Sequence, residues 1–203
     1  MATNYEKIIR ENLTLAYKEG EKRLEETLPA RREAGQLVFT AFGEACSLGH
    51  ETIAFSGKID AGPKGLIASL YAAHSNPGPL TLEPFKAFKD LTGSMPYQGA
   101  FTVNSERVLV PHVLKLKEKG ELLLQSFPGE IHPAGAAGDF SLLLYPLPKI
   151  ALLLVFYLPD EEFPASATCL FSSNALSFMP LDGLADVAEY TAKALIGLVQ
   201  NRS

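Results

Sequence analysis

The sequence predicts an α+β fold in which helices pack on a mainly antiparallel sheet, with one helix near the N-terminus and one near the C-terminus. Three observations predict this class. Apolar residues recur at helical spacing near both ends of the chain. Short glycine-interrupted runs, rich in β-branched and aromatic residues, follow the first helix. An almost continuous apolar run at 151–158 is typical of a central strand covered on both faces.

The first part of the chain changes from a helical pattern to strands and back. Helical spacing predicts one helix over residues 4–27. The segment 35–57 predicts two or three short antiparallel strands. An apolar stripe over 66–74 predicts another helix. The Asn-Pro-Gly-Pro sequence at 76–79 ends it, because a residue before proline avoids the α region.

The middle of the chain is mixed in pattern. Phe85 and Phe88 are expected to anchor a loop or a short strand. A helical pattern returns from Gly99, and Pro111 within it predicts a kink or a helix boundary. A short helix or turn is expected at 119–127.

The last part of the chain predicts further strands and a closing helix. Residues 140–145, 150–158 and 168–171 have the length and composition of strands. An amphipathic pattern then covers 183–200. Because no repeat, low-complexity tract or long polar linker divides the chain, we expect a single domain over residues 1–203.

Composition and charge exclude some classes of partner. The chain has 18 Lys and Arg against 23 Asp and Glu, and this net charge of −5 disfavours nucleic acid, whose phosphates need a cationic surface. The segment 140–159 is long enough to cross a bilayer, but Pro146, Pro148 and Lys149 interrupt it, so we expect no membrane span. The N-terminal residues lack the apolar core of a signal peptide, which predicts a cytoplasmic location.

Cysteines and histidines give no metal or cofactor framework. Cys46 and Cys169 belong to no Cys-x-x-Cys pair, so we expect buried free thiols. His74 and His112 lie on helical stripes and are expected in the core or an interface. If both faced one pocket, they could bind a metal or a tetrapyrrole-type cofactor. Nucleotide, phosphate-loop, metalloprotease and esterase motifs are absent from the sequence, and the cofactor stays unassigned.

Two stretches carry a family resemblance. They read LIASLYAAHSNPGPLTLEPFKAFKDLTGSMPYQGAF from Leu66 and GDFSLLLYPLPKIALLLVFYLPDEEFPASATCLFSS from Gly138. Together they resemble the DUF3786 family of uncharacterised prokaryotic proteins, over about residues 62–203. The chain departs from the family pattern at Ser172, where an acid is usual, and at Ala151, where a proline is usual.

The resemblance implies no established activity. Some relatives are joined to cysteine-rich iron–sulfur modules in corrinoid-linked contexts. The resemblance therefore implies an accessory role beside an iron–sulfur or corrinoid-linked protein. Because this chain lacks the cysteines of such a module, that partner would be a separate protein.

Chain geometry predicts a cluster of acidic side chains. If Pro146–Lys149 closes an antiparallel hairpin, Asp139 lies at the same end of it as the segment that follows Tyr157. The candidate ligand-binding residues at this end are Asp139, Asp160, Glu161, Glu162 and His132.

Converging carboxylates bind Mg²⁺ or Ca²⁺ through oxygen and move one another's pKa values apart. Asp139 and Glu162 are the candidate metal ligands, because Glu162 precedes Phe163, which is expected to be anchored. The alternative is that the acids solvate a loop that Phe163 and Pro164 hold against the core.

Three functional hypotheses follow. The first is a non-catalytic small-molecule-binding or accessory module, in redox or corrinoid-linked metabolism. The second is a metal-assisted hydrolase that uses the carboxylate cluster. The third is a structural subunit of a homo-oligomer. The absence of known catalytic motifs favours the first.

Overall fold

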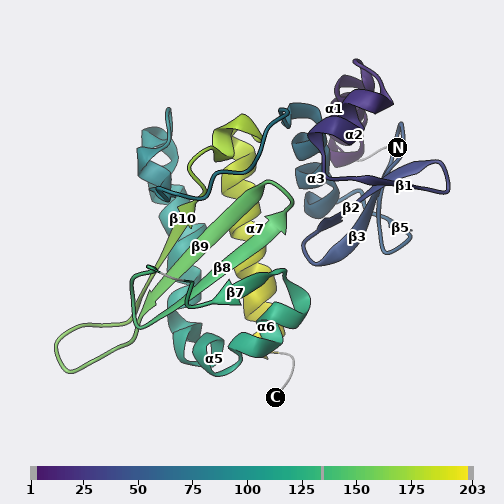
Figure 1. The fold of residues 1–203 in the computed structure, drawn as a ribbon. Helices are drawn as coiled ribbons and strands as arrows, with labels where there is room; N and C mark the ends of the chain where they lie inside the picture. Colours follow the sequence, from purple (N-terminus) through teal and green to yellow (C-terminus); the bar gives the residue numbers. More distant parts are fainter. Residues whose placement is uncertain (1–3, 134, 201–203) are drawn as a thin grey trace.

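The computed structural model describes residues 4–133 and 135–200 and contains two five-stranded antiparallel sheets (Figure 1). The N-terminal sheet is a meander in which each strand pairs with the next along the chain. Its strands are β1 (Arg31–Glu33), β2 (Gln36–Ala41), β3 (Glu44–Leu48), β4 (Ile53–Phe55) and β5 (Lys58–Ile59). Helices α1 (Asn4–Tyr17), α2 (Glu21–Thr27) and α3 (Pro63–His74) pack beside it.

One expectation for this region was wrong and one was confirmed. The single helix expected over 4–27 divides into α1 and α2, because Gly20 has a φ of 89°, which no α-helix accommodates. The two or three strands expected over 35–57 are confirmed as β2, β3 and β4, whereas β1 and β5 flank that segment and were not predicted. The three residues of β1 are all exposed and β5 has only two residues, so neither strand shows an alternating apolar pattern.

The C-terminal sheet has the strand order β6-β10-β9-β8-β7. Its strands are β6 (Lys86–Ala87), β7 (Gly129–Ile131), β8 (Phe140–Leu147), β9 (Ile150–Tyr157) and β10 (Ser166–Phe171). The predicted hairpin is confirmed: β8 and β9 are antiparallel, Phe140 faces Phe156, and Leu147 faces Ile150 across a turn at Pro148 and Lys149.

Central strand β9 is covered on both faces, as predicted. Leu152 and Leu154 belong to the main core, where α7 (Leu181–Gln200) covers the sheet. Leu153 and Val155 point to the outer face, where they form a small second cluster under the loop that carries Leu82. Among the described residues, no helix is long and apolar enough to cross a bilayer.

A winding helical segment lies beside α7 on the inner face of the C-terminal sheet (Figure 1). Pro111, expected at a kink or a helix boundary, lies inside η4 (Arg107–His112), two residues before that 3-10 helix gives way to α5 (Val113–Glu118). In chain order the pieces are η1 (Phe88–Asp90), η2 (Met95–Tyr97), α4 (Gln98–Phe101), the π-helix η3 (Thr102–Glu106), η4 (Arg107–His112), α5 (Val113–Glu118) and α6 (Gly120–Ser126), and η5 (Ala175–Ser177) precedes α7.

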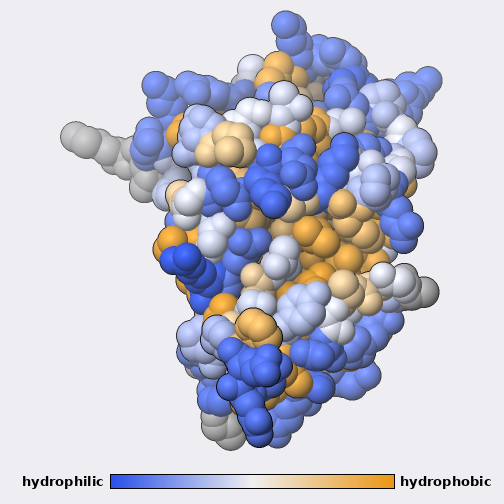
Figure 2. Space-filling model, turned by 90° about the vertical axis from the view of Figure 1, so that its left-hand side faces the viewer, coloured by the Kyte–Doolittle hydropathy of each residue, from blue (hydrophilic) through white to orange (hydrophobic). Residues whose placement is uncertain are grey.

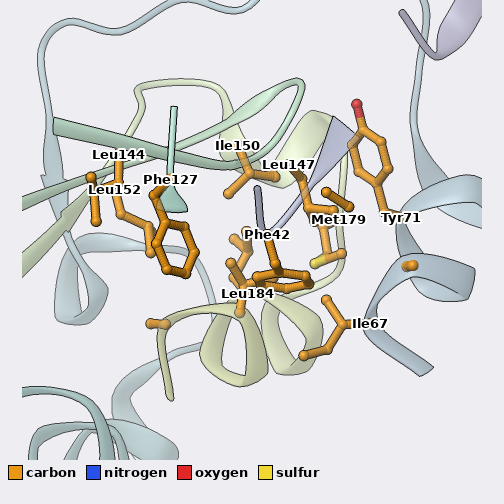
Figure 3. Packing of buried hydrophobic residues seen from close by; sticks show 14 of the residues in the cluster. Phe42, Ile67, Tyr71, Phe127, Leu144, Leu147, Ile150, Leu152, Met179 and Leu184 are labelled. Atoms are coloured by element: carbon orange, nitrogen blue, oxygen red, sulfur yellow. The ribbon is translucent and has the colours of Figure 1, made fainter. Parts of the chain in front are cut away.

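The two sheets meet at the turn between β2 and β3. The Phe42 N–H donates to the Pro146 carbonyl oxygen at 2.6 Å. The Phe42 ring lies beside Leu184 of α7, with Leu147 and Ile150 nearby (Figure 3). One continuous set of buried apolar side chains therefore spans both sheets.

The next residue of the turn, Gly43, permits close approach to the end of α6. Its φ is 76°, and a Cβ atom there would lie 1.6 Å from the Ser126 carbonyl oxygen. Gly57 has a similar φ of 79°, but a Cβ atom there would meet nothing within 4 Å. Substitution at both positions would impose the cost of the left-handed backbone, but only Gly43 would add a steric clash. Comparing them therefore separates the two costs.

We expect Gly43→Ala to lose much more stability than Gly57→Ala. An alanine in the left-handed region costs about 1–2 kcal/mol at either position. At Gly43 the clash with a backbone oxygen adds about 1–3 kcal/mol. Urea denaturation measures both free energies of unfolding. Equal losses in the two variants would contradict the close packing of the turn against α6.

Candidate functional site

The predicted carboxylate residues lie at the open end of the β8–β9 hairpin. The Asp139 Oδ2 atom accepts the Leu158 N–H at 2.9 Å. The Asp160 Oδ1 atom accepts the N–H groups of Phe163 at 2.7 Å and Glu162 at 2.8 Å. These two hydrogen bonds hold the pKa of Asp160 below its usual value, with the larger effect from Phe163.

Hairpin pairing brings Asp139 and Asp160 to one end of the sheet, as predicted. Each of the two carboxylates, however, already accepts a hydrogen bond from the backbone. Glu161 and Glu162 are exposed. Across the described part of the chain, no group of three or more His, Cys, Asp or Glu side chains could hold a metal ion.

Two further residues at this end, Phe163 and His132, are both exposed. Phe163 was expected to anchor the loop, but its side chain is 66% exposed, so this expectation was wrong. The hydrogen bonds of Asp160 hold the loop instead. His132 is exposed, and its ring packs edge-on against Phe140 with the centroids 5.4 Å apart.

Two other histidines and the two cysteines differ in their exposure to solvent. His74 is exposed at the end of α3, and His112 is half-buried at the end of η4. Cys46 and Cys169 are free and buried, as predicted. Burial raises the pKa of both thiols far above the usual range, which keeps them protonated and unreactive in the folded state.

A cavity of about 480 Å³ opens between α7 and the segment 88–105. Its aromatic wall contains Phe88 and Phe101, whose rings stack with a centroid distance of 4.1 Å and an interplanar angle of 3°. The opposing wall is the first half of α7. The remaining lining residues are Tyr97, Ala100, Asn104, Ser105, Leu181, Asp182, Ala185, Asp186 and Glu189.

The carboxylates of this cavity share one face of α7 because of their spacing. Asp182, Asp186 and Glu189 are four and three residues apart, which places them one above the other on a helix. Leu184 and Val187, on the opposite face, are fully buried in the core. The amphipathic pattern that positions α7 therefore also directs these acids toward the cavity.

Crowding of these acids affects Asp186 most. Its carboxylate reaches solvent but lies in the recess, and partial desolvation raises its pKa. The negative charges of Asp182 and Glu189 raise it further. Glu189 forms an ion pair with Lys193 one turn later, whereas Asp182 and Asp186 form no ion pair with any described residue.

A buried hydroxyl adds to the polar groups of the wall. Ser105 lines the cavity and is 1% exposed, and within the described chain its Oγ atom has no hydrogen-bond partner. Leaving such a group unpaired costs about 1–3 kcal/mol. Ser105 and Asn104 belong to the π-helix η3, a rare type of helical turn that occurs frequently at functional sites.

Further cavities lie next to this one on α7 and on the outer face of the C-terminal sheet. A second cavity, of about 550 Å³ between α7, α1 and α3, shares Asp186 and Glu189 with the first. Figure 2 shows the molecule from the β10 side, where an apolar hollow interrupts a largely hydrophilic surface. On the outer face of the C-terminal sheet, a cavity of about 180 Å³ lies over Leu143 and Leu153.

Comparison with known proteins establishes the family. Residues 22–194 match the model of a domain of unknown function, DUF3786. The chain belongs to the DUF3786 family. The matched region includes the N-terminal sheet, which the resemblance over 62–203 had left out, and it contains every residue that lines the 480 Å³ cavity. No curated protein and no solved structure matches this DUF3786 chain.

Divalent cations test the carboxylate end of the hairpin. A metal bound by Asp139 and Glu162 would raise the melting temperature with concentration, and Glu162→Gln would abolish the rise. Because no group of three or more acidic, His or Cys side chains in the described chain could hold a metal ion, we expect no change with Mg²⁺ or Ca²⁺. A rise in the wild type that disappears in Glu162→Gln would instead support the hydrolase hypothesis.

The pKa of Asp186 predicts a pH-dependent effect on stability. A carboxyl group whose pKa is higher in the folded than in the unfolded protein destabilises the folded state when it ionises. The free energy of unfolding therefore falls as pH rises from the unfolded pKa through the folded pKa. We therefore expect Asp186→Asn to raise the melting temperature at neutral pH, and the gain to vanish below the ordinary pKa of Asp. Thermal melts across this pH range measure it.

Asp182→Asn is the matched control for this experiment. Asp182 lies in the first turn of α7, where a negative charge stabilises the helix, and its Oδ1 atom accepts the Gly183 N–H at 2.9 Å. We expect this variant to gain no stability at neutral pH. A gain at Asp182 with none at Asp186 would contradict the assigned electrostatics.

Proposed function

We propose that this DUF3786 protein is a non-catalytic small-molecule-binding module whose ligand occupies the cavity between α7 and the segment 88–105. The observation that carries the proposal is a cavity of about 480 Å³ whose accessible lining combines the exposed Tyr97 ring and apolar Leu181 and Ala185 with the carboxylates of α7. A bound ligand would cover the Tyr97 ring and the apolar lining, and its polar groups would meet the carboxylates.

Size and composition support binding. Small-molecule sites commonly measure about 300–1,000 Å³ and combine an apolar lining with a few polar groups. The cavity here, at about 480 Å³, has both features. Its described lining contains carboxylates, an amide and hydroxyls, but no pairing of a nucleophile with a histidine base. This composition favours recognition of a ligand over its chemical conversion.

An accessory role beside a redox or corrinoid-linked partner belongs to the same proposal. Cys46 and Cys169 lie in different sheets and are both buried, so neither is placed to hold an exposed iron–sulfur cluster. The ligands of any such cluster would come from the partner. The proposed setting is the cytoplasm, where an acidic domain with free thiols is chemically stable.

Blocking the cavity tests the proposal. Ala185→Phe places a phenyl ring inside the cavity, whereas Ala194→Phe places the same ring on the same helix outside it, in the lining of two neighbouring cavities. We expect compounds that stabilise the wild type in a thermal-shift screen of small molecules to lose their effect in Ala185→Phe and to keep it in Ala194→Phe. Equal responses of the two variants, or no stabilising compound for the wild type, would refute it.

A further inference from the structure

We propose that the ligand of this cavity is an organic amine, with its ammonium group on the carboxylates of α7 and its apolar body on the aromatic wall. This inference rests on the proposed binding function and adds the chemical class of the ligand. It derives from the charges, the rings and the spacing of the residues that line the cavity.

The charge of the lining favours a cation. Among the described lining residues, three are acidic and none is lysine or arginine. Lys193 is already paired with Glu189. Asp182 and Asp186 have no cationic partner within the described chain, so a bound ammonium would relieve their mutual repulsion. An anionic ligand would increase that repulsion.

The aromatic wall suits the rest of such a ligand. Phe88 and Phe101 are buried and form the base of this wall, while Tyr97, 60% exposed, presents the accessible ring at its rim. Aromatic faces attract ammonium groups and also pack against apolar carbon. Leu181 and Ala185 continue this apolar lining beside the carboxylates. The cavity therefore offers adjacent regions for a charged end and an apolar body.

The spacing of the acids favours an ammonium group over a metal ion. Residues one helical turn apart have Cβ atoms about 5–6 Å from each other. Ca²⁺ needs six or more oxygens at about 2.3–2.6 Å, and no described group of acidic side chains provides such a shell. An ammonium group needs only a few acceptors, which the separate carboxylates could supply.

Three probes with the same phenyl body separate charge from shape. Phenethylamine is cationic, phenethyl alcohol is neutral and hydrocinnamate is anionic. Ligand-observed NMR titrations of the full chain measure their affinities. We expect the amine to bind about tenfold more tightly than the alcohol, because its hydrogen bonds to carboxylates are charge-assisted. Hydrocinnamate should bind most weakly.

Variants locate the binding and assign the charge effect. Asp186→Asn should weaken the amine several-fold and leave the alcohol unchanged, while Ala185→Phe should remove both and Ala194→Phe neither. If the alcohol or hydrocinnamate binds as tightly as the amine and Ala185→Phe removes it, the amine inference fails and the binding function stands. If none of the three probes binds at the cavity, the amine inference is also overturned. The thermal-shift screen of small molecules then tests the binding function independently.

Discussion

The contact between the Phe42–Gly43 turn and the β8–β9 hairpin determines how the two sheets fit together. The turn joins two strands of the N-terminal sheet, and its Phe42 N–H bonds to Pro146 of the C-terminal sheet. The Phe42 ring also packs against Tyr190 of α7, with centroids 4.6 Å apart. Because α7 supplies the acidic wall of the cavity, the position of that wall depends on this junction.

The sequence predicted those elements whose boundaries are marked by apolar runs and prolines. The β8–β9 hairpin was predictable because Pro148 and Lys149 interrupt two apolar runs of strand length. Lys149 itself is only 7% exposed, and its Nζ atom donates to the Asn76 carbonyl oxygen at 3.1 Å. A break such as the one at Gly20 was missed because apolar spacing continues across it, while the backbone conformation changes.

The site was less predictable, for two physical reasons. Hairpin topology placed Asp139 and Asp160 at one end of a sheet, but it carried no information about which backbone N–H groups their oxygens would accept. The cavity joins the segment 88–105 to α7, which lie far apart in the sequence and meet only in the folded structure. One signal was present: acids spaced four and three residues apart, at 182, 186 and 189, on an amphipathic helix.

Each sheet contains one buried cysteine thiol, so alkylation of the native protein can report local opening of each sheet separately. Cys46 lies on β3 and Cys169 on β10, and the Cys169 N–H donates to Glu106 of the π-helix at 3.1 Å. An alkylating reagent can reach either sulfur only when its surroundings separate. The labelling rate of Cys169 therefore follows the detachment of the π-helix from β10, while that of Cys46 follows the other sheet, without any engineered probe.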